Sequence, residues 1–118
     1  MGIRKLIQSL LGPATTRSSI VGTWRLANLE VPHPFLRYEF TLSSDGTCAY
    51  DSEVSTKQGE FTVSGSGTWT FAGAILQYSL GDSSESAKVN LVGDTMILDR
   101  IPAVQIAAGT PCTFQRVT

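Results

Sequence analysis

One run of alternating residues, 60–71, constrains the fold of this chain more than any other stretch. Each odd position from 61 to 71 holds an aromatic residue, a valine or a glycine. A period of two is typical of a β-strand with one buried face. A hairpin turn at Gly65-Ser66 would break that phase. We therefore expect one long strand bent by its glycines, as small barrels require.

Strand patterns and turns also fill the rest of the chain after residue 20. The expected strands are 21–30, 37–43, 47–55, 60–71, 75–81, 86–92, 95–101 and 111–117. Their connections alternate between tight (44–46, 72–74, 93–94) and longer (31–36, 56–59, 82–85, 102–110). Alternate connections of an up-and-down barrel lie at the same end. The sequence predicts an all-β, eight-stranded antiparallel barrel with a closed end and an open, loop-bearing end.

The expected inward face of this barrel is rich in aromatic residues. Of the ten aromatics, only Phe35 falls outside the inward phase, in the loop after the first strand. The other nine are Trp24, Tyr38, Phe40, Tyr50, Phe61, Trp69, Phe71, Tyr78 and Phe114. An eight-stranded barrel is filled by side chains or holds one small ligand, and these aromatics favour a filled interior or a small cavity.

The first 19 residues form a separate segment, before a barrel domain at 20–118. Residues 3–11 place their apolar side chains on one face of a short amphipathic helix, which Gly12-Pro13 ends. A helix packed on the barrel is the main interpretation. The alternatives are a peripheral membrane anchor, with Arg4 and Lys5 beside lipid headgroups, and a degenerate signal peptide.

Composition and cysteine positions limit the partners and the compartment. The net charge is −1 and 16% of residues are charged, without a basic stripe, so nucleic acid is not an expected partner. The expected topology places Cys48 and Cys112 near opposite ends of non-adjacent strands, too far apart for a disulfide. Two reduced thiols favour a cytoplasmic location over an exported one. One histidine without a C-x-x-C pair predicts no metal site and no cofactor.

The first strand opens with Gly22-Thr23-Trp24, and the last one ends near Arg116. Glycine allows a tight turn before the indole enters the core. The strand order brings Arg116 beside Trp24, where a guanidinium over an indole is favourable. A G-x-W start, eight strands and this basic residue resemble the lipocalin-like (calycin) barrels, and the small bacterial lipocalin-like domains in particular. The resemblance implies that Gly22, Trp24 and Arg116 are structural, and it implies no single activity.

Candidate ligand-binding residues gather at the expected open end. His33, held between two prolines, would contact a ligand there together with Phe35 and Arg37. A rigid loop without chemistry, haem ligation and acid–base work are the other interpretations of His33. Further candidates point inward: Tyr38, Tyr50, Trp69 and Tyr78. The apolar stretch 101–109 is a candidate lid.

Three functions remain open from the sequence. The first is a non-enzymatic binding module for a small hydrophobic molecule in the barrel cup. The second is a filled barrel that acts through its surface, as an inhibitor, a scaffold or a membrane-peripheral partner using residues 3–11. A weaker alternative is a barrel isomerase or cyclase, which an inward ionisable group would favour. No catalytic residue is nominated, because the expected strand carboxylates all face outward, and the oligomeric state is left open.

Overall fold

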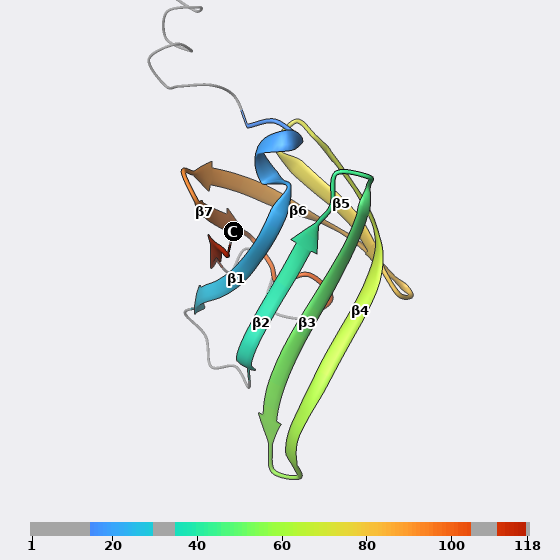
Figure 1. The fold of residues 1–118 in the computed structure, drawn as a ribbon, viewed down its shortest axis with the longest axis vertical. Helices are drawn as coiled ribbons and strands as arrows, with labels where there is room; N and C mark the ends of the chain where they lie inside the picture. Colours follow the sequence, from blue (N-terminus) through green and yellow to red (C-terminus); the bar gives the residue numbers. More distant parts are fainter. Residues whose placement is uncertain (1–14, 30–34, 105–110, 118) are drawn as a thin grey trace, which may run out of the picture.

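The chain forms a closed barrel of eight antiparallel strands joined in sequence order, β1 to β8, with β8 pairing back to β1. The computed structural model describes residues 15–29, 35–104 and 111–117, and Figure 1 shows the arrangement. The strands are β1 (Gly22–Leu29), β2 (Phe35–Leu42), β3 (Thr47–Thr56), β4 (Gly59–Ala72), β5 (Ile75–Leu80), β6 (Ser83–Val92), β7 (Thr95–Leu98) and β8 (Cys112–Arg116). The predicted fold class and strand order are confirmed.

Strand β4 is continuous over 14 residues, as its alternation predicts. Its glycines are needed because neighbouring atoms approach the backbone closely. A Cβ on Gly67 would lie 1.6 Å from the carbonyl oxygen of Ser79, and one on Gly65 would lie 2.7 Å from the Tyr50 ring. Both are closer than any real Cβ contact, so these two positions allow the strand to bend around its neighbours.

The barrel interior is packed with aromatic and aliphatic side chains. Tyr38 lies among Phe40, Tyr50 and Phe114, with ring centroids 5.9–6.5 Å apart. Phe40 and Phe114 meet edge to face at 4.9 Å. Aromatic pairs at such distances each stabilise by ~0.5–1.5 kcal/mol beyond their buried area. Cys48 and Cys112 are both buried in this core and neither is in a disulfide bond, as predicted.

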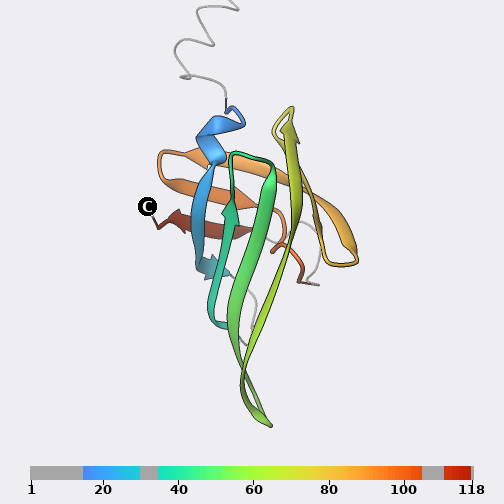
Figure 2. The same cartoon turned by 45° about the vertical axis from the view of Figure 1, so that its right-hand side comes forward.

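The β3–β4 hairpin extends well beyond the barrel body, which Figures 1 and 2 both show. β4 pairs with β5 only from Gly67 to Ala72, so its first half continues past the wall of the barrel. Phe61 lies on this extension and is 50% exposed. The prediction that Phe61 faces the interior is therefore wrong, because phase fixes the face of a strand but not where the barrel ends.

Two tryptophan–arginine pairs stack at the closed end of the barrel. The guanidinium carbon of Arg116 lies 4.3 Å from the centroid of the Trp24 ring, and the two residues are register partners on β8 and β1. Arg17 stacks on Trp69 in the same way at 4.4 Å. The Trp24 indole is fully buried and donates to the carbonyl of Ile20. Gly22 has a φ of 143°, a conformation that other residues rarely adopt.

A short 3₁₀ helix, η1 (Ser18–Ile20), precedes β1 and places the buried Ile20 side chain against the core. The amphipathic helix predicted at 3–11 lies outside the described residues. In the described part of the chain, no helix has the length and apolarity needed to cross a membrane.

Candidate functional site

The open end of the barrel contains an inward-facing carboxylate, Glu85, at the start of β6. It alternates with Ala87 and Val89, both buried, and so belongs to the inward side of the strand. The hydroxyl of Tyr78, its register partner on β5, donates to Glu85 Oε1 at 2.8 Å. The backbone N–H of Ala103 donates to the same oxygen at 3.2 Å. Among the described residues, the buried interior is mainly apolar apart from Ser52, and it holds this polar cluster around Glu85.

The surroundings of Tyr78 and Tyr38 suppress ionisation of both phenols. Burial, followed by the hydrogen bond to Glu85, raises the pKa of Tyr78 far above its usual value. Burial also raises the pKa of Tyr38, and the nearby Tyr78, Tyr50 and Glu85 add to that shift. Both phenols therefore stay protonated near neutral pH and act as hydrogen-bond donors.

The segment that follows β7, residues 99–104, closes over this cluster. Ile101 and Pro102 are buried, and the Tyr38 hydroxyl donates to the carbonyl of Pro102. Ala103, which bonds Glu85, has a φ of 65°. That left-handed conformation costs a non-glycine residue roughly 1–3 kcal/mol. The segment is thus tied to the barrel by two hydrogen bonds to interior side chains.

Arg100 adds a positive charge at the edge of the cluster. Its Nη1 lies 3.9 Å from Glu85 Oε2, a long ion pair. Its Nε is buried and has no hydrogen-bond partner among the described residues. A buried N–H without an acceptor costs about 1–3 kcal/mol, so Arg100 offers a donor that an acceptor group on a bound molecule can satisfy.

A hollow of about 250 Å³ opens beside the cluster, where β1 and β2 separate; we call it the β1–β2 hollow. β1 pairs with β2 only from Gly22 to Arg25, whereas its pairing with β8 on the other side runs from Trp24 to Leu29. The hollow is lined by Leu26, Ala27, Asn28, Phe35, Leu36, Arg37 and Tyr38. Three predicted ligand residues, Phe35, Arg37 and Tyr38, therefore share one hollow, and Tyr38 joins it to the polar cluster.

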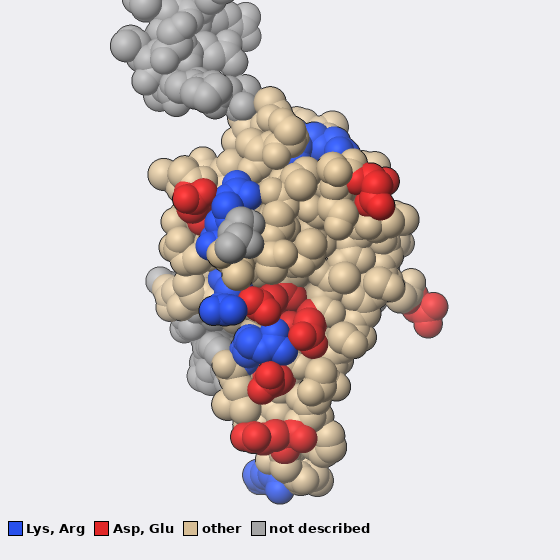
Figure 3. Space-filling view, in the orientation of Figure 1, with Lys and Arg blue, Asp and Glu red and all other residues tan. Residues whose placement is uncertain are grey.

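The guanidinium of Arg37 is engaged on the outer face of the barrel. It contacts Glu39 at 2.8 Å, Asp51 at 2.9 Å and Glu53 at 3.2 Å. The hydrogen bonds that Arg37 donates to Asp51 and Glu53 raise the pKa of Arg37 further above its already high value. Figure 3 shows such blue and red clusters on the face that carries β1–β3. The guanidinium of Arg37 is therefore paired with these carboxylates, although Arg37 also lines the β1–β2 hollow.

The remaining predicted ligand residues lie in three different places. Tyr50 stacks on Tyr38, and Tyr78 is part of the polar cluster. Trp69 lies at the closed end, where its indole donates to the carbonyl of Ser43 at 2.9 Å and carries Arg17 on its face. The structure therefore does not bring Trp69 to the open end. His33 lies outside the described residues.

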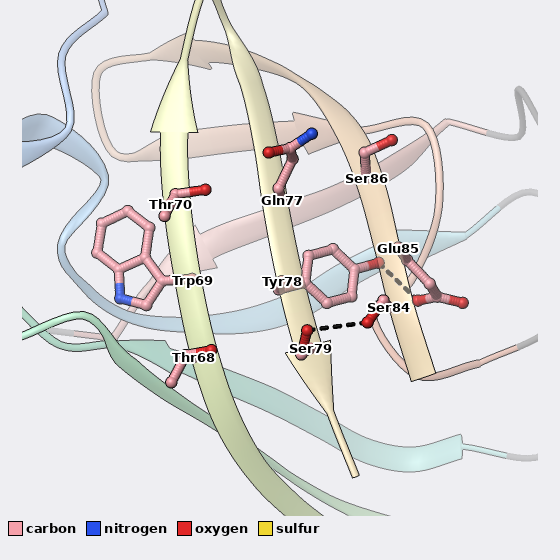
Figure 4. A pocket seen from close by; sticks show the side chains of 9 residues that line it. All are labelled: Thr68, Trp69, Thr70, Gln77, Tyr78, Ser79, Ser84, Glu85 and Ser86. Carbon is pink, nitrogen blue, oxygen red and sulfur yellow. Dashed lines mark hydrogen bonds between the residues drawn. The ribbon is translucent and has the colours of Figure 1, made fainter. Parts of the chain in front are cut away.

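Another hollow, of about 490 Å³, lies on the outer surface of β4–β6. We call it the outer hollow. Figure 4 shows the side chains around it, with the Ser79–Ser84 and Tyr78–Glu85 hydrogen bonds dashed. The outward residues that line it are Thr68, Thr70, Gln77, Ser79, Ser84 and Ser86. These six side chains offer hydroxyls and an amide, and Trp69, Tyr78 and Glu85 line the hollow as well.

Comparison with solved structures gives a match to a lipocalin-like protein from Bacteroides uniformis ATCC 8492, with a TM-score of 0.54 and 15% sequence identity. The match covers 82% of this chain and 97% of that protein. The fold is lipocalin-like. No protein-family model matches the chain, and no curated protein matches it significantly. At this level of identity the lipocalin-like comparison establishes the fold alone.

The chemistry available in this lipocalin-like barrel is that of a polar cluster at the open end of a mainly apolar interior. Glu85 supplies an acceptor, while Tyr78, Tyr38 and Arg100 supply donors. Among the described residues, no group of three His, Cys, Asp or Glu side chains is placed to hold a metal ion. The arrangement suits noncovalent binding, with the apolar walls providing burial and the cluster providing orientation.

Proposed function

We propose that this protein binds a small, mainly apolar molecule at the open end of the barrel, beneath residues 99–104. The molecule carries an acceptor group that faces Arg100. The observation that carries this proposal is the polar cluster around Glu85, placed among buried side chains that are mainly aromatic and aliphatic. Ligand sites in proteins are mainly apolar and contain a few convergent polar groups.

Entry of a molecule requires residues 99–104 to move, and their attachments make this feasible. Two hydrogen bonds to interior side chains hold the segment, one from Tyr38 to Pro102 and one from Ala103 to Glu85. Outside them, the Lys88 N–H donates to Asp99 Oδ1 at 3.0 Å and Arg100 lies 3.9 Å from Glu85. A ligand that accepts from Tyr38 and donates to Glu85 replaces both of the hydrogen bonds to interior side chains. Each such bond contributes only about 0.5–1.5 kcal/mol net, and opening also relieves the left-handed backbone at Ala103.

A fluorescent probe with apolar rings and an acceptor group, anilinonaphthalene sulfonate, tests the proposal. We expect saturable binding to the folded protein. Arg100→Leu should weaken that binding about tenfold, because it removes a charged donor worth about 1.5–3 kcal/mol. Ser84→Ala is the matched control, since it removes a hydroxyl from the outer hollow and should leave the affinity unchanged.

Two results would contradict the proposal. One is an absence of saturable binding to the folded wild-type protein. The other is an affinity that Ser84→Ala lowers while Arg100→Leu does not, which would place the probe in the outer hollow. Circular dichroism and thermal unfolding of each variant establish that it is folded before its affinity is compared.

A filled barrel that acts through its surface is the second candidate, favoured by the ring contacts around Tyr38. Four aromatic residues, Tyr38, Phe40, Tyr50 and Phe114, occupy the interior between β2, β3 and β8. The inward side chains of β5 and β6, among them Leu76, Leu80, Ala87 and Val89, belong to the same buried core, so a ligand needs the space that residues 99–104 vacate. If apolar probes fail to bind the folded protein, the surface-acting function becomes the better account.

A further inference from the structure

The first half of β4, residues 59–66, has a free strand edge. On one side it pairs with β3 without any register shift, from Thr56↔Gly59 to Ala49↔Ser66. On the other side, β5 begins its pairing only at Gly67. Within the described ranges no other strand takes that place. Figures 1 and 2 show this stretch continuing beyond the β5–β6 turn.

The hydrogen-bond pattern identifies the backbone groups on this edge. Trp69 N–H donates to the carbonyl of Gly46, on the β3 side, at 2.9 Å. Gly81 N–H donates to the carbonyl of Ser66, on the opposite side, at 3.4 Å. Because the direction alternates along an antiparallel strand, odd residues bond β3 and even residues point away. The N–H and C=O groups of Glu60, Thr62 and Ser64 therefore point to the free edge.

Apart from the charge of Glu60, the side chains on this edge do not protect it from pairing. Natural edge strands carry prolines, lysines or bulges that prevent pairing with another chain. Residues 59–66 contain no proline or lysine, and their pairing with β3 has no bulge. Phe61 and Val63 are 50% and 43% exposed on one face of the ribbon. An open, regular edge thus adjoins an uncovered apolar surface.

We propose that the occupant of this edge is a second copy of the chain, paired antiparallel β4 to β4 about a two-fold axis at Thr62. In that register Glu60 faces Ser64 of the other copy, and Thr62 faces itself. The three outward residues of each copy then form six backbone hydrogen bonds. Phe61 lies directly across from Val63 of the other copy, an aromatic–β-branched pair that stabilises antiparallel strands. No like charges face one another.

The ends of the free stretch fit the same register. The Gly81–Ser66 hydrogen bond closes the edge at residue 66, so an added strand must stop there. A copy centred on Thr62 stops at this point and brings its Lys57 to the Gly81–Asp82 turn of the other copy. Lys57 and Asp82 are both exposed and of opposite charge. This charge complementarity favours a second copy over an unrelated peptide.

Charge substitution at the two-fold axis tests the pairing in the full chain. Sedimentation velocity should show a reversible, concentration-dependent dimer of the wild-type protein. Thr62→Lys and Thr62→Glu should each raise the dimer dissociation constant about tenfold or more, because each sets like charges directly opposite one another. Mixing the two variants should restore the dimer as a heterodimer. Thr70→Lys is the matched control, on the same outer face of β4 but within the stretch paired to β5, and should dimerise as the wild type does.

A cysteine at the axis gives an independent readout. Thr62→Cys should form a covalent dimer on mild oxidation, since facing residues of a hydrogen-bonded pair have Cα atoms about 5.5 Å apart, within disulfide range. Thr70→Cys should not. The proposal is overturned if the wild type stays monomeric at all concentrations, if Thr62→Lys dimerises as the wild type does, or if mixing the charge variants restores nothing.

Discussion

The Tyr78 hydroxyl and the Glu85 carboxylate meet 2.8 Å apart inside the barrel, across the β5–β6 pair. A phenol and a carboxylate on facing residues of neighbouring strands form the base of the polar cluster. Glu85 also receives the N–H of Ala103, so this pair connects the barrel wall to the segment over the open end. Stability and binding are therefore expected to depend on the same two side chains.

Replacing Tyr78 with phenylalanine tests the strength of this connection. The variant keeps the ring but removes a donor to a charged group, so the free energy of unfolding should fall by about 1.5–3 kcal/mol. Urea unfolding measures that change. Ser79→Ala, which removes a half-buried hydroxyl that bonds Ser84 on the opposite face of β5, should change it by no more than about 0.5 kcal/mol. An unchanged stability in Tyr78→Phe would show that the pair contributes nothing to the fold.

Stability should fall in alkaline solution because buried acidic groups resist ionisation. Burial, assisted by the charge of Asp99, raises the pKa of Cys112 from its usual 9.0 to about 11. The folded state favours the protonated thiol, so its contribution is complete below pH 9.0 and is lost between pH 9.0 and about 11. The raised pKa values of Tyr38, Tyr78 and Cys48 act in the same direction. Cys112→Ala should make the decline shallower, and a stability independent of pH across this range would contradict the argument.

The Trp24–Arg116 pair should show energetic coupling. Trp24→Ala should destabilise by about 3–5 kcal/mol, as the loss of a buried aromatic does. Arg116→Ala should cost less, and the two losses should not add, because the groups share one contact at 4.3 Å. Arg116 also donates to the carbonyls of Val21 and Ser19. A double-mutant cycle measures the coupling energy between the two residues. Strictly additive losses would show that the stacking contact contributes no stability.

Gly67→Ala should be more damaging than Gly65→Ala. The added methyl at 67 meets the backbone oxygen of Ser79 at 1.6 Å, which cannot move without disturbing the β4–β5 pairing. The methyl at 65 meets the Tyr50 ring at 2.7 Å, and a side chain shifts more easily. We expect losses of about 1–3 kcal/mol at 65 and a larger one at 67. Thermal unfolding of both variants ranks their losses of stability. A larger loss in Gly65→Ala than in Gly67→Ala would contradict the close approach of Ser79 to β4 at Gly67.

The barrel itself could be predicted because alternation and turn chemistry report directly on strands. Strands joined in sequence order placed Arg116 on Trp24 and kept Cys48 away from Cys112. The lengths of two connections were predicted wrongly, because 56–59 and 82–85 were expected to be longer and the turns there are only 57–58 and 81–82. Single residues at strand ends carry no such signal. Phe61 follows the inward phase of β4, yet it is exposed because β5 is too short to accompany that half of the strand.

The polar cluster could not be predicted because it lies where two strand ends were placed wrongly. The sequence predicts a strand at 86–92, whereas β6 begins at Ser83 and so includes Glu85. It also predicts a strand at 95–101, whereas β7 ends at Leu98, which releases Arg100 into the closing segment. Extending the phase of Ala87 and Val89 back by one step would have placed Glu85 inward. The turn at Gly81-Asp82 was the available signal, because a glycine with positive φ allows a two-residue hairpin there.

The most direct test of the binding proposal is to map backbone amide shifts by NMR while anilinonaphthalene sulfonate is added. Saturable shifts are expected at Tyr78, Glu85 and Ala103, extending to the β1–β2 hollow at Leu26. Shifts confined to the outer hollow at Thr68, Gln77 and Ser84, or no saturable shifts at all, would contradict the binding proposal.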